Sequence, residues 1–362
     1  MEKIGDVELR LAKGPVPHYK ELKELERSIV NVIIEEFGTQ ELIKRYSNPL
    51  WFNSLACLLG FEWNYSGMTT VTLKALKEIS KEDNLPIIVL GGKGKKSKIT
   101  EEIEEKDIND KLKDKLKELS ITSAKVDNYL VQDGYNLYFH FLISDEKGNS
   151  TIINQKMSIK EQKVRRFHWI SNDYFNDPQI GLGNNSKTLN IASKESEELR
   201  RSIVEIVNNE KIDKIKNYVI RLKSYENKNS SILKYFGKED EFIFYQELPY
   251  YLKIPEKIYW KALEIKETVD NFRDLLFIKG FGPGLLRALA YTAKIIYGTE
   301  ISWKDPIIYT FAHGTKVGKP YYVKKALMLE EAEFLKNAIE EAKLNNNFKL
   351  RALKRLNELI DI

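Results

Sequence analysis

The sequence predicts an α+β fold that is mostly helical, with a small mixed or antiparallel sheet mid-chain and a helical C-terminal region. Apolar residues recur every three or four positions over long stretches that end near glycines, which favours helices. Two short runs of aromatic and β-branched residues are separated by turn-forming residues, which favours a sheet. The chain is thereby divided into an N-terminal helical region (1–85), an α/β region (86–222), a linker (223–244) and a C-terminal region (245–362).

The composition is that of a folded protein without membrane segments. The 362 residues, of which 42% are hydrophobic, suffice for two or three domains with their own cores. No apolar run approaches the roughly 20 residues that cross a bilayer, and no signal peptide begins the chain, so we expect a cytoplasmic protein. Cys57 is the only cysteine, which excludes zinc fingers and internal disulfides. A net charge of +5 indicates a nucleic-acid partner only where basic residues cluster locally.

Three helices are expected in the N-terminal region. Residues 19–37 repeat apolar side chains at helical spacing, and Gly38 follows as a stop. Either Ser47 or Asn48 is placed to cap a second helix. A third helix is expected over 71–79.

A loop rich in glycine and lysine follows the first expected strand, at 86–90. It presents backbone amides and positive charge, so we expect Lys93, Lys95 and Lys96 to contact phosphates of a DNA backbone. The alternative is a flexible basic loop, since the spacing does not match a Walker A motif.

The densest polar and aromatic stretch of the chain surrounds a predicted β-hairpin. Its strands are expected at 137–144 and 150–157, with turn residues at 145–149. Tyr138 and His140 should point to the same side, because side chains alternate along a strand.

Acid, base and cation types converge around this hairpin, as hydrolysis of a phosphodiester requires. We predict as catalytic residues Asp133, His140, His168, Arg165 and Arg166, and as ligands of Mg²⁺ or Mn²⁺ Asp127 and Asp133. Each also has a structural interpretation, because buried histidines are usually hydrogen-bonded and adjacent arginines can simply hold phosphates.

The remaining elements are expected to be helical. An amphipathic helix is predicted over 193–207, and the polar, repetitive segment 223–244 reads as the linker. The last helix, near 329–359, carries a basic stripe.

A glycine-rich turn between two apolar segments is the most specific motif of the chain. Residues 275–278 lead into Lys279-Gly280-Phe281-Gly282-Pro283-Gly284, and a second apolar segment begins at once. This order is that of a helix-hairpin-helix motif, in which glycines let a phosphate approach the amides at the start of the second helix. The alternative is a plain loop between packed helices, and Leu286 departs from the small residue usual at its position.

The region 245–362 is therefore expected to be a helix-hairpin-helix DNA-binding domain. Its predicted contacts with the DNA backbone, which include a polar loop at 311–320, are Lys279, Gly280, Gly282, Gly284, Arg287, His313 and Lys316.

Taken together, several stretches make the chain resemble the family called domain of unknown function 763. They are Asn48-Pro49-Leu50-Trp51-Phe52, Gly67-Met68-Thr69-Thr70, Gly91-Gly92-Lys93-Gly94, Gln132-Asp133-Gly134-Tyr135, Arg165-Arg166-Phe167-His168-Trp169, the hairpin motif, and Asp305-Pro306 with Phe311-Ala312-His313-Gly314. The resemblance covers nearly the whole chain and implies an architecture, but no particular chemistry.

A partial resemblance concerns the helix-hairpin-helix DNA glycosylases. In that family a catalytic aspartate follows the hairpin and stabilises the sugar cation, and here Asp305 follows at a similar distance. Gly284 stands where bifunctional members carry a Schiff-base lysine, so the resemblance implies a monofunctional enzyme at most. The alternative is that Asp305 is a turn or cap residue before Pro306.

The sequence thus predicts a DNA-binding protein of repair or processing, with three interpretations of its chemistry. The first is a structure-specific, metal-dependent nuclease. The second is a non-catalytic, DNA-structure-binding repair accessory, and the third is the monofunctional glycosylase.

Overall fold

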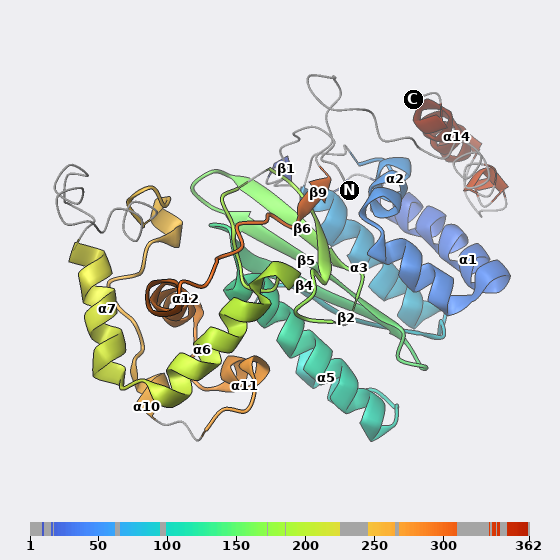
Figure 1. The fold of residues 1–362 in the computed structure, drawn as a ribbon. Helices are drawn as coiled ribbons and strands as arrows, with labels where there is room; N and C mark the ends of the chain where they lie inside the picture. Colours follow the sequence, from blue (N-terminus) through green and yellow to red (C-terminus); the bar gives the residue numbers. More distant parts are fainter. Residues whose placement is uncertain are drawn as a thin grey trace.

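The computed structural model describes most of the chain and confirms the α+β prediction (Figure 1). It describes residues 9–10, 16, 18–61, 66–94, 99–171, 173–184, 186–224, 245–264, 268–309, 333, 335–337, 339–340 and 346–360. The predicted linker therefore lies almost entirely outside the described residues, as do Lys95, Lys96, His313 and Lys316.

Three long helices form the N-terminal part: α1 (Tyr19–Ser47), α2 (Pro49–Leu58) and α3 (Ser66–Glu82). The backbone leaves the helical conformation at Gly38, where the stop was predicted, but the helix resumes and continues to Ser47. Asn48 then caps α2, since its side-chain oxygen accepts from the amides of Leu50 and Trp51 at 2.9 and 3.3 Å.

The other helices follow strand β2 (Ile87–Lys93). The α-helices are α4 (Ile99–Glu104), α5 (Asp110–Lys125), α6 (Glu197–Asn209), α7 (Ile212–Ser224), α10 (Lys261–Glu264), α11 (Phe272–Phe277), α12 (Pro283–Tyr297) and α14 (Asn346–Ile360). A π-helical turn, η1 (Val126–Leu130), continues α5, and two 3₁₀ turns are η2 (Lys194–Ser196) and η3 (Tyr250–Leu252).

Nine strands are described, most of them in one central sheet. They are β1 (Leu9–Arg10), β2 (Ile87–Lys93), β3 (Val131–Gln132), β4 (Asn136–Asp145), β5 (Ser150–Ser158), β6 (Lys163–Trp169), β7 (Gln179–Leu182), β8 (Leu189–Asn190) and β9 (Ile307–Tyr309). The main sheet runs β2-β4-β5-β6-β7-β9, with β1 paired to β6, while β3 and β8 form a separate pair. Neighbours are antiparallel except for β7 and β9, which are parallel.

The β4–β5 hairpin lies where the sequence predicts it. Asp145 organises its turn by accepting from the amide of Asn149 at 2.9 Å, and Gly148 takes the positive φ of 79° that the turn needs.

Helices cover the central sheet on both sides (Figure 1). One face packs on α1 and α3, and the other on α5 and the helices that follow it. Alternate residues of one strand therefore enter different cores: Phe139 and Phe141 of β4 face α1 and α3, whereas Leu142 faces α5. The core on the α5 side of the sheet also holds Phe281 and Leu286. The α11–α12 region therefore shares a core with the sheet, whereas the sequence predicts a linker at 223–244 between the two regions.

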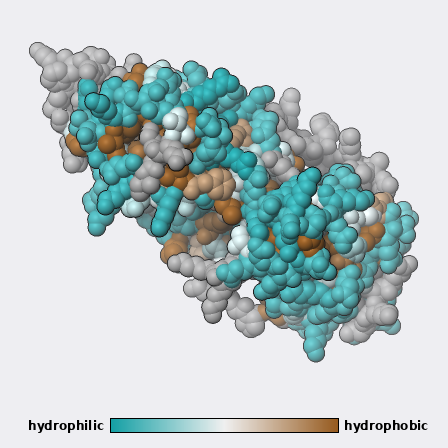
Figure 2. Space-filling view, turned by 90° about the horizontal axis from the view of Figure 1, so that it is seen from below, coloured by the Kyte–Doolittle hydropathy of each residue, from teal (hydrophilic) through white to brown (hydrophobic). Residues whose placement is uncertain are grey.

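The molecular surface is largely hydrophilic on the face shown in Figure 2, where hydrophobic residues form small, separated groups. Among the described helices, none is both long enough and apolar enough to span a bilayer.

Replacing the α2 cap should lower stability by a small, specific amount. The Asn48 side chain accepts hydrogen bonds from two amides that have no partner within the helix. We therefore expect Asn48→Ala to reduce the free energy of unfolding by about 1 kcal/mol in urea titrations. The control is Ser47→Ala, since the Ser47 hydroxyl is exposed and donates only to the carbonyl of Lys44. Equal losses in the two variants would contradict the role of Asn48.

Candidate nucleic-acid interface

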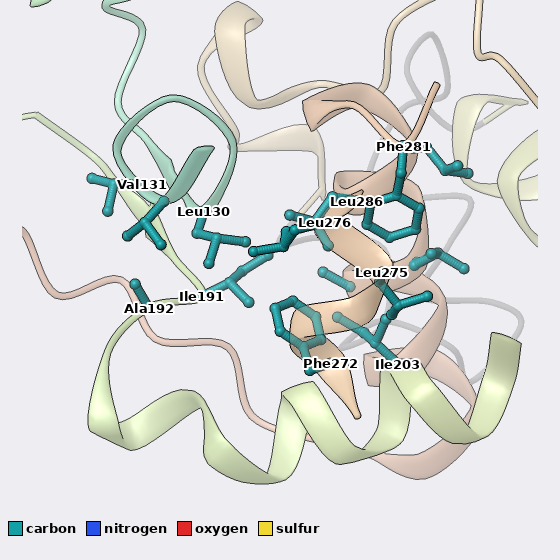
Figure 3. Close-up of a cluster of buried hydrophobic side chains, with 14 of the residues drawn as sticks. Leu130, Val131, Ile191, Ala192, Ile203, Phe272, Leu275, Leu276, Phe281 and Leu286 are labelled. Atoms are coloured by element: carbon teal, nitrogen blue, oxygen red, sulfur yellow. The ribbon is translucent and has the colours of Figure 1, made fainter. Parts of the chain in front are cut away.

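The predicted hairpin motif forms a tight turn between α11 and α12. The amide of Phe281 donates to the carbonyl of Ile278 at 3.0 Å, and Gly280 supplies the positive φ of 87°. Phe281 is buried and packs beside Leu276 and Leu286, as Figure 3 shows. The departure at Leu286 thus leaves the turn intact, because this side chain fills the core under it.

The start of α12 is open towards solvent at Gly282. The Gly282 cap has no side-chain hydrogen bond, and a Cβ built there would meet no heavy atom within 4 Å. Pro283 has no N–H, so the first amides that the helix leaves without internal partners are those of Gly284 and Leu285. The exposed side chain of Lys279 lies at the turn that precedes them. Amides at a helix N-terminus together with a cation are the donors that suit a phosphate.

The other predicted hairpin contacts pack against neighbouring parts of the protein. Gly280 is exposed, but the ring of Tyr259 occupies the position that a Cβ there would take, and Pro255 Cγ lies 2.7 Å from the position of a Cβ on Gly284. Arg287 donates to the carbonyl of Tyr251, and burial lowers the pKa of its guanidinium. The surface site is therefore formed by Lys279, Gly282 and the α12 amides, and Arg287 supports it from inside.

The glycine and lysine stretch lies at the end of the edge strand β2. Gly91 is required by close packing, because a Cβ there would collide with the carbonyl of His140. Lys93 is exposed beside a cavity of about 280 Å³, whose lining includes Lys74 and Lys77. Lys77 is engaged internally, since its Nζ lies 2.6 Å from Glu102 Oε2.

A buried ionic network occupies the α5 face of the sheet. Asp133 accepts from Lys156 Nζ at 2.6 Å and from Arg165, and Arg165 also donates to Asp305. Asp305 accepts in turn from the amide of Ser186 at 2.9 Å. The side chains of Asp133, Lys156 and Arg165 are fully buried, and two carboxylates balance two cations. Such a balanced set is stable in a low dielectric as long as each member keeps its partners.

The buried Asp127 and the partly buried His140 form a second polar group on the same face. Asp127 accepts from Asn154, Trp169 and Gln179 at 2.6, 3.1 and 3.1 Å, and its burial raises its pKa to about 6. The ring nitrogens of His140 contact Asn154 Oδ1 at 2.5 Å and Ser120 Oγ at 2.8 Å, and burial lowers the pKa of the ring.

The fit of a divalent metal to this region is poor. The oxygens of Asp133 are occupied by cations, and those of Asp127 by three neutral donors. Within the described part of the chain, no cluster of three or more acidic, histidine or cysteine side chains could hold a metal.

Arg166 and His168 lie on the opposite face, against the N-terminal helices. Arg166 donates to Asn53 Oδ1 at 2.6 Å and Thr69 Oγ1 at 3.0 Å, and burial lowers its pKa to about 9. His168 Nδ1 lies 2.8 Å from the carbonyl of Tyr46. The five predicted catalytic residues are therefore divided between two faces of the sheet.

The expected alignment of Tyr138 with His140 is wrong. The β4–β5 register shifts between Leu137 and Phe139, and the extra residue turns Tyr138 to the other face. There its hydroxyl accepts from Gln155, whereas His140 contacts Asn154 on the α5 face.

Some residues of these sites were not predicted from the sequence. Lys156 lies two positions after Asn154, so the alternation of side chains along a strand places both on one face. This alternation could have identified Lys156 as a partner of Asp133. Tyr251, Tyr259 and Pro255 carry no local signal, because their contacts with the hairpin join segments distant in sequence.

Comparison with known proteins gives a family match. The model of the family described as "Protein of unknown function (DUF763)" matches residues 5–323. Searches of the curated proteins and of the solved structures found no match.

Replacing His168 should change how stability depends on pH. Burial, with the nearby charge of Arg166, lowers the pKa of His168 well below its ordinary 6.5, so the folded ring stays neutral while the unfolded chain takes up a proton. The stability that depends on this neutral ring is complete above about pH 6.5 and falls by about 1.4 kcal/mol per pH unit below it. Relative to the wild type, His168→Asn should therefore regain about 1.4 kcal/mol per pH unit on acidification, in urea titrations at several pH values.

The control for this measurement is His18→Asn, which replaces an exposed histidine. A stability difference between His168→Asn and the wild type that does not change with pH would contradict the prediction.

Proposed function

The chain belongs to the family described as protein of unknown function (DUF763), and from its geometry we propose that it is a DNA-binding protein of repair or processing in the cytoplasm. It binds the phosphate backbone of DNA independently of the base sequence. The observation that carries this proposal is the open N-terminus of α12 at Gly282, next to the exposed Lys279.

A phosphate at this turn would find complementary charge and donors. The amides of Gly284 and Leu285 point out of the helix end, where the aligned peptide dipoles add partial positive charge. Lys279 adds a full charge whose long side chain tolerates many positions of the phosphate. These groups recognise phosphates and make no use of base edges, so the binding is independent of sequence.

The geometry of the buried polar groups supports the accessory interpretation over the nuclease. Asp133 and Asp127 are buried, and their oxygens are occupied by protein donors. His140 is partly buried, and Ser120 and Asn154 engage its two ring nitrogens, so the ring as it stands has no free nitrogen to transfer a proton. In a non-catalytic, DNA-structure-binding protein these residues would have a structural role, which agrees with their contacts.

The contacts of Asp305 bear on the glycosylase interpretation. Asp305 is bonded to Arg165, to the amide of Ser186 and, at 3.1 Å, to the amide of Ile307. These bonds favour the role of a turn residue that leads into β9 over that of a carboxylate facing a flipped base.

Substitutions at the open turn should weaken DNA binding. Gly282 has φ of −112° and ψ of 178°, a conformation that valine adopts readily, so Gly282→Val should fold normally while its side chain blocks the approach of a phosphate. We expect Gly282→Val and Lys279→Ala each to lower the affinity for duplex DNA in fluorescence anisotropy, whatever the sequence. For Lys279→Ala, the log-log dependence of affinity on salt should become shallower by roughly 0.9.

Lys44→Ala is the matched control, because Lys44 is 76% exposed and lies on α1. Unchanged affinity in Gly282→Val, or binding that is insensitive to salt, would exclude the hairpin as the contact.

Assays of DNA cleavage separate the binder from the two enzymes. We expect no cutting of branched, nicked or single-stranded DNA with Mg²⁺ or Mn²⁺. We also expect Asp133→Asn to cost about 3–5 kcal/mol of stability, because Lys156 and Arg165 lose a buried counter-charge. The exposed Asp114→Asn is the control for stability.

Metal-dependent cleavage that Asp133→Asn or His140→Ala abolishes in a folded protein would instead establish the nuclease. Strand breakage that appears only after alkali would point to the glycosylase.

A further inference from the structure

Aromatic side chains are exposed around the α11–α12 turn. Among the described residues, the large exposed aromatic side chains are Phe37, Tyr250, Tyr259, Phe277 and Tyr297. Tyr250, Tyr259 and Phe277, which we call the aromatic strip, are 61%, 52% and 45% exposed. Phe277 directly precedes the turn, Tyr259 contacts Gly280 within it, and Tyr250 precedes Tyr251, whose carbonyl accepts from Arg287 of α12. Single exposed aromatics are ordinary on protein surfaces, but a group at one motif calls for an explanation.

Two members of the strip belong to a segment that lies along the hairpin in order. The carbonyl of Tyr251 accepts from Arg287, Pro255 packs on Gly284, and the ring of Tyr259 covers Gly280. Residues 251 to 259 therefore run antiparallel to residues 280 to 287. As a result, Tyr250 and Tyr259 lie towards opposite ends of the open helix start.

Cations accompany the rings of the strip. Lys160 Nζ lies 4.4 Å from the centroid of the Tyr250 ring, and Lys125 Nζ lies 4.6 Å from that of Phe277. On the segment beside the hairpin, Lys257 and Lys261 are exposed near Tyr259 in sequence, and Lys279 precedes Gly280. Rings and positive charges therefore occur together on the segments around the site proposed for a phosphate.

We propose that the aromatic strip stacks unpaired nucleotides next to the backbone held at α12, so that the preferred ligand is DNA with a single-stranded segment. This inference rests on the proposed function and names its substrate class. A single strand offers both bases, each with a face that can stack on an exposed ring, and phosphates, which the neighbouring cations attract. In a duplex the bases are already stacked on one another, so a duplex gains nothing from these rings.

The experiment compares two DNA ligands that differ in one feature. A blunt duplex and the same duplex with an unpaired thymidine tail of about ten nucleotides are titrated with the full chain by fluorescence anisotropy. We expect the tailed DNA to bind more tightly. Tyr250→Ala should weaken binding of the tailed DNA roughly ten-fold, which is within the range measured for loss of one stacked base, and leave blunt duplex binding within about two-fold.

Two further variants make the test specific. Tyr250→Phe keeps the stacking ring and should bind tailed DNA like the wild type. Tyr297→Ala removes an exposed ring at the far end of α12 and should change neither affinity. Tyr259→Ala should resemble Tyr250→Ala on tailed DNA, but the Tyr259 ring also packs against Gly280 in the turn, so Tyr250 gives the cleaner result.

The possible failures are distinguishable. If the blunt duplex binds in a manner that depends on Gly282 and the tail adds nothing, or Tyr250→Ala leaves the tail preference unchanged, the stacking inference is overturned and the proposed function stands. If neither DNA binds, both are overturned, and the strip is then better explained as a contact for another protein. Tail binding that depends on Tyr250 without any effect of Gly282→Val supports the strip and removes the hairpin from the proposal.

Discussion

The ion pair between Arg165 and two carboxylates holds the middle of the molecule together. Arg165 is on β6, Asp133 directly follows β3, and Asp305 lies two residues before β9, so one guanidinium joins three distant segments. A buried pair adds little net stability compared with apolar packing, but breaking it is costly, because the remaining charge has no water to solvate it. The network therefore acts mainly as a constraint on which segments can lie together.

This constraint reaches the surface site through a short chain of contacts. Ser186, whose amide binds Asp305, donates its hydroxyl to the carbonyl of Asp133 at 2.8 Å and lies 2.8 Å from the hydroxyl of Tyr251. Tyr251 accepts from Arg287 through its carbonyl, and Gln132 donates to the carbonyl of Pro283 at 3.1 Å. The polar residues that suggested chemistry thus hold the first turn of α12 in place against the sheet.

Local elements of this fold were predictable from the sequence, and their spatial combination was not. The β4–β5 hairpin, the cap at Asn48 and the Gly282-Pro283 start of α12 depend on nearby residues, and the structure agrees with each. The five candidate catalytic residues lie close together in the sequence because they belong to, or adjoin, strands of a sheet that is covered on both faces. Charged and polar side chains on such strands need buried partners on each face. Because side chains alternate along β6, Arg165 and Arg166 lie on opposite faces. Tyr138 and His140 are separated by a β-bulge, which no residue type in the sequence predicts. The partners of Arg165 lie 32 and 140 residues away, beyond the reach of any local pattern.

The position of β9 at the edge of the sheet also has a consequence in time. Its parallel neighbour β7 and Arg165 are both synthesised before Asp305, and Arg165 precedes Asp305 by 140 residues. At synthesis rates of roughly 5–20 residues per second, the ribosome needs on the order of ten seconds to deliver that second carboxylate. During this interval the nascent sheet has an unpaired edge at β7 and an arginine with one of its two counter-ions. Among the described strands, β9 is therefore the last to be synthesised, and it pairs with an edge that was made well before it.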